Sequence, residues 1–144
     1  MAAKMDGSKS RTYVLLGDGE LQEGLIWEAA MAAGHYKLDN LCAIVDWNGL
    51  QIDGKNDDVM TVKPIDEKFR AFGFNVLVID GHNFEEIFAA FDAARECKGK
   101  PTVIVAKTNK GRGVSFMEDN PGWHGKAPSE DEAKQAVAEL GGEW

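Results

Sequence analysis

The alternation of short apolar runs with segments of helical spacing is the feature that most constrains the fold of this chain. The apolar runs contain many β-branched residues, and three of them stop at an aspartate or a glycine. They cover residues 11–16, 41–45, 74–79 and 102–106, and we expect each of them to form a β-strand. The first two runs show no polar alternation, so we expect both faces of these strands to be buried.

Helices are predicted between the strands. Apolar residues recur at helical spacing over residues 20–34 and over residues 64–72. Asn83 and Glu86 form a capping box that opens a third helix. One helix is therefore predicted between each apolar run and the next.

Two segments are more polar than the rest. Residues 51–63 have no periodicity, and we expect an ordered loop there. Near the end of the chain, Ser129 and Glu132 form a second capping box. The helix that it opens is expected to bury three apolar side chains: Ala133, Val137 and Leu140.

This pattern predicts an α/β fold in which a parallel sheet carries helices on both faces and is joined by right-handed crossovers. With 44% hydrophobic residues, 144 residues are enough for one core and too few for two ordinary domains. We therefore expect residues 1–144 to form a single domain. In such sheets, ligands bind beyond the carboxyl ends of the strands, and the most polar motifs of the chain follow those ends.

Charge and cysteine content limit the functional class. Sixteen Lys and Arg against 24 Asp and Glu give a net charge of −8, which opposes general binding to nucleic acids. No apolar run approaches the length of a membrane span, and the first residues lack the plan of a signal peptide. Cys42 and Cys97 have no metal-ligand spacing. We expect a soluble, cytoplasmic protein with reduced thiols and with no nucleic-acid or membrane partner.

Asp18 lies in the motif Gly17-Asp18-Gly19, directly after the first predicted strand. The two glycines allow a tight turn and a close approach of the backbone to a ligand. Asp18 supplies a hard oxygen at the start of a helix. A simpler interpretation is that Asp18 only caps this helix, and the tripeptide alone does not decide between the two.

Asn48 follows the second predicted strand, 30 residues after Asp18. A strand–helix–strand crossover has about this length, so it can bring the two strand ends together and let both side chains share a cavity. Carboxylate, amide and carbonyl oxygens would hold Mg2+ and leave room for a diphosphate. Alternatively, Asn48 is a turn residue of the pair Asn48-Gly49.

A GDG motif followed at this spacing by a strand-end Asn resembles the diphosphate and Mg2+ motif of thiamine-diphosphate enzymes. Within that group, residues 17–54 resemble the N-terminal section of transketolase, with the sequence GDGELQEGLIWEAAMAAGHYKLDNLCAIVDWNGLQIDG. Residues 107–132, KTNKGRGVSFMEDNPGWHGKAPSEDE, resemble a downstream segment of the same family. The NGLQIDG and GWHGKAP motifs are similar to the bacterial and archaeal form in which transketolase is divided into two polypeptides.

The resemblance implies a site for thiamine diphosphate and Mg2+, for which Ca2+ or Mn2+ could substitute. Asp18, the Asn48 side chain and the Leu50 carbonyl would bind the metal. Gly17 and Gly19 would let the backbone approach the diphosphate. The implied fold is the diphosphate-binding type of thiamine-diphosphate-binding domain.

Ile52 and His124 would complete the implied site. Ile52 would pack beside the cofactor, although a plain core position fits the sequence equally well. His124, in the motif GWHG, would lie near the diphosphate and the sugar substrate. There it would act as a catalytic hydrogen-bond donor or proton carrier. The alternative for His124 is a surface loop.

Other polar residues have weaker claims to function. Glu23 matches an acidic position of the family's subunit contact, or it is a solvated helix charge. Gly24 lies inside the predicted helix, which is consistent with close packing. His35 suits a helix end, and His82 is interpreted as part of a strand-end turn. The cationic loop of residues 107–113 does not match a nucleotide P-loop; the transketolase resemblance places it at the border of the cofactor pocket.

The resemblance also implies the reaction. Transketolases transfer a two-carbon ketol group from a ketose phosphate to an aldose phosphate, in the pentose phosphate pathway. The catalytic Glu of the family lies in a pyrimidine-binding domain that this sequence lacks, so we expect a transketolase C-terminal subunit to supply it within a homo- or hetero-oligomer. The family's upstream segment is missing as well. We therefore expect a fragment that is inactive alone.

Three rival interpretations remain at this point. Another thiamine-diphosphate enzyme, such as deoxyxylulose-phosphate synthase or a 2-oxo-acid decarboxylase, would share the GDG-to-Asn motif. The GLQIDG and WHGKAP motifs argue against such an enzyme. A truncated module without catalysis would only associate with a partner. An ordinary dinucleotide-binding domain is disfavoured because no G-x-G-x-x-G follows the first predicted strand.

Overall fold

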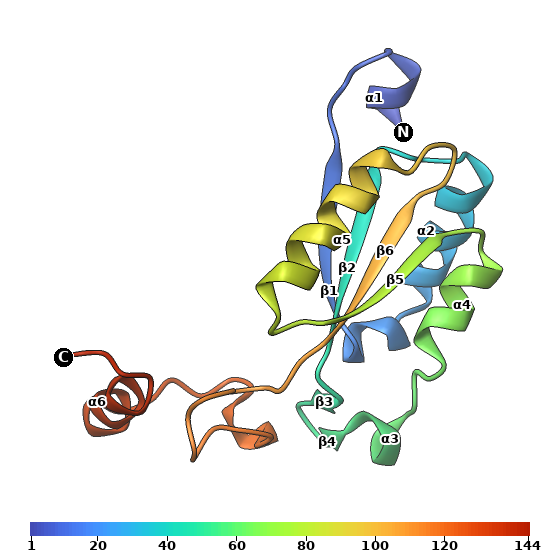
Figure 1. Ribbon diagram of the computed structural model, residues 1–144. Coiled ribbons are helices and arrows are strands. Elements are labelled where there is room, and N and C mark those ends of the chain that lie inside the picture. The colour runs from blue at the N-terminus through green and yellow to red at the C-terminus, as the bar shows by residue number, and fades with distance from the viewer.

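A computed structural model describes all 144 residues and has a four-stranded parallel sheet at its centre. The strands lie in the order β1 (Thr12–Gly17), β2 (Leu41–Trp47), β6 (Thr102–Lys107) and β5 (Asn75–Asp80), as Figure 1 shows. Every neighbouring pair is parallel. The predicted α/β fold is confirmed, and the four apolar runs are its four strands.

Helices cover the two faces of the sheet unequally. α2 (Gly24–His35) and α4 (Ile65–Ala71) lie on one face, and α5 (Phe84–Glu96) lies on the other (Figure 1). The larger core forms beneath α2 and α4, where buried Phe69 packs against Trp27. Burying a large apolar side chain contributes roughly 1.5–3 kcal/mol, so this face contributes most of the apolar stabilisation.

The α5 face has a smaller core and leaves β1 open. Cys42 and Ile104 are buried there against α5. Leu15 of β1 remains 71% exposed, because β1 is an edge strand and α5 packs mainly on β5 and β6. The expectation that the first strand is buried on both faces is therefore wrong.

Residues 50–59 contain short regular elements where the sequence predicted a loop. β3 (Leu50–Gln51) pairs antiparallel with β4 (Gly54–Lys55), and α3 (Asn56–Val59) follows directly. These elements are only two to four residues long. A segment of that length is too short to show a period in the sequence.

The predicted helix over residues 20–34 is interrupted. A 3-10 turn, η1 (Gly19–Gln22), ends at Glu23, whose backbone is extended with ψ of 129°, and α2 then begins at Gly24. A Cβ on Gly24 would meet no atom within 4 Å. Gly24 is therefore an open helix start within this chain, and close packing against another subunit stays a prediction.

The end of the chain lies away from the larger core. η2 (Pro121–Trp123) and α6 (Glu130–Glu139) follow β6 beyond the carboxyl ends of the strands (Figure 1). The predicted capping box of Ser129 and Glu132 is present. α6 buries none of its residues, so the prediction of burial was wrong for three apolar side chains: Ala133, Val137 and Leu140.

A four-residue helix, α1 (Ala2–Met5), precedes β1. None of the helices has both the length and the apolar character that a membrane span requires.

Candidate functional site

Residues beyond the carboxyl ends of β1 and β2 line a cleft of about 680 Å3. They come from four separate parts of the chain: residues 17–23, residues 46–53, Lys110 and His124. The sheet topology brings the first two stretches together, because neighbouring parallel strands end at the same edge. The wall of the cleft includes all seven residues that the sequence predicted for the cofactor site: Gly17, Asp18, Gly19, Asn48, Leu50, Ile52 and His124.

Asp18 joins the ends of β1 and β2, and its side chain is buried at 1% exposure. Its Oδ1 accepts a hydrogen bond from the Gly19 N–H at 2.9 Å, which caps η1. Its Oδ2 accepts a second one from the Gly49 N–H at 2.6 Å. The simple cap role is therefore present, and the same carboxylate also holds the turn that follows β2.

The surroundings of Asp18 favour its neutral form. Burial raises the pKa of this carboxyl above its ordinary value, and the charge of nearby Asp46 raises it further, although hydrogen bonds from Gly49 and Gly19 act in the opposite direction. The Asn56 amide also lowers the pKa, yet no hydrogen bond of normal geometry joins it to Asp18. A cation beside Asp18 would offset both the burial and the repulsion.

Asn48 is held in the turn between β2 and β3. Its Nδ2 donates to Asp46 Oδ2 at 3.1 Å, and its Oδ1 accepts from the Leu50 N–H at 2.9 Å. Gly49 follows with φ of +76°, a conformation that favours glycine. The turn role of Asn48 is thus observed. The Asp46 contact also fixes the direction of the amide, and Oδ1 keeps a second lone pair for a ligand.

The β3–β4 hairpin packs closely against Gly19. A Cβ on Gly19 would lie 3.2 Å from the Cβ of Gln51, so a larger residue would need a small shift of the hairpin relative to η1. The Gly17 N–H donates to Glu20 Oε2 at 2.6 Å, which ties the end of β1 to the same turn. The backbone of the GDG motif is therefore fixed at the cleft wall.

Ile52 lies at the tip of the hairpin and is 72% exposed, which excludes the core position that the sequence left open. It offers apolar surface to the cleft. The Leu50 side chain is buried instead, so at this position the backbone is the part that remains available to a ligand.

His124 ends η2, and its side chain is exposed at the cleft. Its backbone N–H donates to the Pro121 carbonyl at 2.9 Å, and the neighbouring Trp123 Nε1 donates to the Phe116 carbonyl at 2.9 Å. These bonds hold the segment, while the imidazole itself makes no hydrogen bond within the chain. The ring is therefore available to a ligand.

Lys110 belongs to the loop of residues 107–113, which the transketolase resemblance placed at the border of the cofactor pocket without singling out a residue, and it lies in the cleft. It lines the cleft and makes no ion pair within the chain. Its neighbours in the cationic loop differ, since Lys107 lies over the Trp47 ring and Arg112 does not reach the cleft. The sequence placed the whole loop at the pocket border and did not distinguish Lys110 from Lys107 or Arg112.

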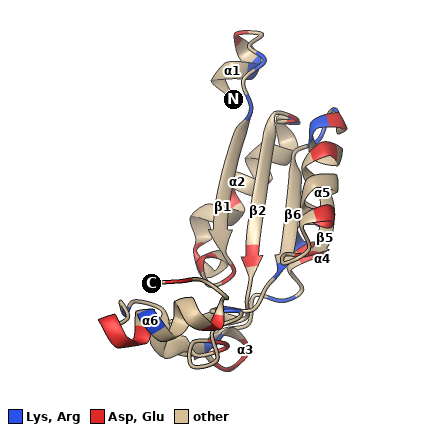
Figure 2. Ribbon diagram, turned by 60° about the vertical axis from the view of Figure 1, so that its left-hand side comes forward, with Lys and Arg blue, Asp and Glu red and all other residues tan.

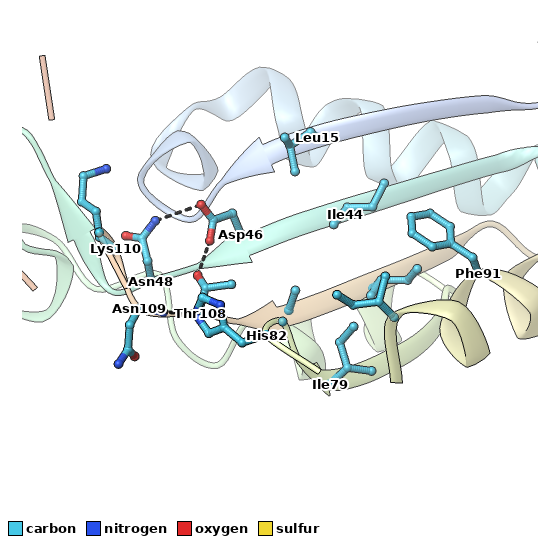
Figure 3. A pocket seen from close by; sticks show the side chains of 15 residues that line it. Leu15, Ile44, Asp46, Asn48, Ile79, His82, Phe91, Thr108, Asn109 and Lys110 are labelled. Atoms are coloured by element: carbon cyan, nitrogen blue, oxygen red, sulfur yellow. Dashed lines mark hydrogen bonds between the residues drawn. The ribbon is translucent and has the colours of Figure 1, made fainter. Parts of the chain in front are cut away.

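A second cavity of about 460 Å3 lies beside the cleft, between the sheet and α5 (Figure 3). Seven of its 15 lining residues are hydrophobic, and they come from the sheet and α5. At the end that it shares with the cleft, Asp46 accepts hydrogen bonds from Asn48 and Thr108 (dashed lines in Figure 3). Lys110 also lines both spaces.

The donor set fits a hard divalent cation that bridges to a diphosphate. Mg2+ prefers carboxylate, amide and carbonyl oxygens, which Asp18, Asn48 and Leu50 can supply. A diphosphate alone would meet repulsion, because five acidic residues line the cleft: Asp18, Glu20, Glu23, Asp46 and Asp53.

Charges of both signs meet at this edge of the sheet. Figure 2 shows the acidic end of β2 and the basic end of β6 side by side. The molecule contains no separate cluster of three or more His, Cys, Asp or Glu side chains that could hold a metal ion. Any hard cation at this edge would therefore depend on mixed oxygen ligands.

Comparisons with known proteins agree with one another. The family model described as "Transketolase, thiamine diphosphate binding domain" matches residues 2–143. The 6-deoxy-6-sulfo-D-fructose transketolase subunit SqwG of Clostridium sp. (strain MSTE9) is 45% identical over 140 residues, which are 97% of this chain and 51% of that protein. An apulose-4-phosphate transketolase subunit of Actinobacillus succinogenes is 46% identical over 97% of this chain and 50% of its own length.

Solved structures match as well. The crystal structure of transketolase from Campylobacter jejuni superimposes with a TM-score of 0.88 at 37% identity, over 94% of this chain and 21% of that one. The chain spans about half the length of the curated subunits that it matches.

Proposed function

The chain belongs to the transketolase thiamine-diphosphate-binding domain family, and from this membership we propose that it holds the diphosphate end of thiamine diphosphate in a divided transketolase. The observation that carries the proposal is the cleft. Residues from three distant stretches of the chain, each expected to serve the cofactor, line one cavity.

In this proposal Asp18, the Asn48 amide oxygen and the Leu50 carbonyl bind Mg2+. The two backbone hydrogen bonds to Asp18 keep its carboxylate in place. The metal in turn neutralises the acidic cleft and allows the diphosphate to enter. The fixed backbone of Gly17 and Gly19 forms the adjacent wall.

The remaining cleft residues serve the other parts of the cofactor and the substrate. Ile52 packs its exposed apolar surface against the cofactor. Lys110 balances part of the diphosphate charge. His124 donates a hydrogen bond or carries a proton near the diphosphate and the sugar, since its imidazole has no partner within the chain.

The bound cofactor supplies the carbanion chemistry that moves a two-carbon ketol group between sugar phosphates. This chain binds and orients it. We propose that a transketolase C-terminal subunit with a pyrimidine-binding domain supplies the catalytic Glu. The exposed start of α2, with Glu23, is the proposed subunit contact.

The substrate class that we propose is a ketose phosphate donor and an aldose phosphate acceptor. The relatives are named for 6-deoxy-6-sulfo-D-fructose and for apulose-4-phosphate. The proposal is therefore not restricted to sugars of the pentose phosphate pathway.

Calorimetric titration of the chain with thiamine diphosphate, with and without Mg2+, tests the cofactor role. We expect binding that depends on Mg2+. Asp18→Ala should weaken it at least about tenfold, because hydrogen bonds and contacts to a charged group are worth roughly 1.5–3 kcal/mol.

Asp131→Ala is the matched control, because Asp131 is an exposed carboxylate on α6 outside the cleft and its loss should leave the affinity unchanged. Binding of equal strength without Mg2+ would contradict the metal role. Absence of any binding would favour a module that only associates with a partner.

A further inference from the structure

The side chain of His82 reaches from the turn after β5 to the loop after β6. Its Nε2 accepts a hydrogen bond from the backbone N–H of Asn109 at 2.8 Å. The donor is a backbone amide, so Nε2 carries no proton in this contact. Figure 3 shows His82 beside Thr108 and Asn109, at the end of the apolar cavity nearest the cleft.

The turn that carries His82 makes a second hydrogen bond to the same loop. The Gly81 N–H donates to the Lys107 carbonyl at 2.7 Å. A Cβ on Gly81 would lie 2.4 Å from Thr108 Cγ2 and 3.0 Å from the Lys107 carbonyl oxygen, so the turn packs against the loop without space for a side chain. Asp80 Oδ1 accepts from the His82 N–H at 2.9 Å and shapes the turn itself.

The loop is also held from the opposite side, by the end of β2. The Thr108 N–H donates to the Trp47 carbonyl at 3.2 Å, and the Thr108 hydroxyl donates to the Asp46 carboxylate. Thr108 is therefore fixed by β2, whereas the Asn109 amide has His82 as its partner. Beyond Asn109 the loop reaches the cleft at Lys110.

The Lys110 position is linked onward to the segment that carries His124. The Lys110 carbonyl accepts from the Asp119 N–H at 2.9 Å, and Asn120 caps η2 through a hydrogen bond from the Gly122 N–H at 2.9 Å. Displacement of the loop at Asn109 would therefore move Lys110 directly and the η2 segment through it.

We propose that His82 is a positioning residue, which holds the loop of residues 107–113 through the Asn109 amide and so keeps Lys110 at the cleft. His82 does not line the cleft itself. The part of this proposal that concerns cofactor affinity rests on the proposed function; the part that concerns the loop does not.

Limited digestion with trypsin tests the loop directly, because Lys107, Lys110 and Arg112 are cleavage sites within it. In His82→Ala we expect cleavage at these sites to be roughly fivefold faster, as the loss of one net hydrogen bond implies. In His82→Gln the amide oxygen can take the place of Nε2, so the rate should return to within about twofold of the wild type. Mass spectrometry of the fragments identifies the sites.

His35→Ala serves as the matched control. It removes an exposed imidazole at the end of α2 and should retain the wild-type rate at the loop sites. Equal rates in the wild type and His82→Ala would overturn the proposal. Equal acceleration in His82→Ala and His82→Gln would also overturn it, because the hydrogen bond would then not be the cause.

Titration with thiamine diphosphate and Mg2+ provides the second readout. We expect weaker binding by about threefold to tenfold in His82→Ala and recovery in His82→Gln. If the wild type binds no cofactor, the proposed function fails while the digestion result still decides the role of His82. Unchanged affinity in a His82→Ala chain with a loosened loop would overturn the link to the cleft.

Discussion

The side chain of Asp18 makes two backbone hydrogen bonds, of which the sequence predicted only the helix cap. One carboxylate oxygen caps η1, and the other holds the Gly49 amide. Because both oxygens are engaged, the carboxylate is ordered before a ligand arrives. A ligand of the cleft then avoids the entropy cost of fixing that side chain.

We expect the Ile52 side chain to contribute to cofactor affinity and hardly at all to the stability of the fold. Its side chain is 72% exposed, so Ile52→Ala should change the free energy of unfolding by no more than about 0.5 kcal/mol. The same substitution should weaken binding of thiamine diphosphate by roughly fivefold to tenfold, because apolar surface covered by the cofactor is lost. Denaturant unfolding and calorimetric titration measure the two effects.

Leu25→Ala is the comparison for Ile52→Ala, because Leu25 is 70% exposed but lies on α2 outside the cleft. Its affinity for the cofactor should equal that of the wild type. Equal affinity in both variants would argue that Ile52 does not touch the cofactor.

Sequence reasoning found the residues that belong to a motif and missed those defined by packing. Asp18 and Asn48 stand at strand ends with a recognisable spacing. Asn56 carried no such signal, since it lies in a polar segment, yet it is buried at 3% exposure next to Gly19. Neither its Nδ2 nor its Oδ1 has a hydrogen-bond partner. Burial of this kind depends on tertiary contacts that the amino-acid sequence does not show.

Among the helices and strands, continuous apolar runs and capping residues gave the most accurate predictions of where an element lies. The strands agree with the predicted runs within about two residues, the usual uncertainty of element ends. Asn83 caps α5 as expected. The predicted capping box is incomplete, because the Glu86 carboxylate accepts from the Asp80 N–H and the Asn83 side chain, not from the Asn83 N–H. The break at Glu23 was missed because the apolar spacing continues across it, while the backbone changes direction to let η1 meet the hairpin.

The capping box of α6 makes this helix sensitive to acid. Hydrogen bonds from the Ser129 N–H and Lys126 lower the pKa of Glu132 from 4.5 to about 2. A lowered pKa means that the ionised carboxylate stabilises the folded helix above pH 4.5, and that this contribution is lost as the pH falls toward 2. We expect α6 to keep its helicity down to about pH 4.5 and to fray below it, as NMR chemical shifts of Ala133 and Ala136 would report.

Glu132→Gln keeps an acceptor for the Ser129 N–H but has no titrating group, so it should remove most of this acid dependence. Glu143→Gln removes one carboxylate outside the box and should leave the profile unchanged. A profile that is the same in Glu132→Gln and in the wild type would show that the box does not control the stability of α6.

The whole molecule is asymmetric. Two helices cover one face of the sheet, one helix covers part of the other, and the η2–α6 segment extends beyond the strand ends without a buried residue in α6 (Figure 1). The alternation of strands and helices predicted the layers. It could not predict which surfaces remain open, because apolar runs look alike whether or not another element covers them.

Catalysis is expected to need a complementary subunit. In the proposed function, the cleft beyond the four-stranded sheet holds only the diphosphate end of the cofactor. With thiamine diphosphate, Mg2+ and sugar phosphates, the purified chain should show no ketol transfer above background. Addition of a C-terminal transketolase subunit should restore it, as a coupled assay of product formation would measure. Turnover by the chain alone would refute the claim that catalysis needs a second subunit.

The open edge of β1 bears on how long a free copy of the chain would survive in a cell. An unpaired strand edge with apolar side chains such as Tyr13 and Leu15 is a template for aggregation. Quality-control proteases and chaperones recognise surfaces of this kind. The steady-state abundance of the chain would then follow the supply of whatever polypeptide covers that edge, so that synthesis of the two would need to be matched.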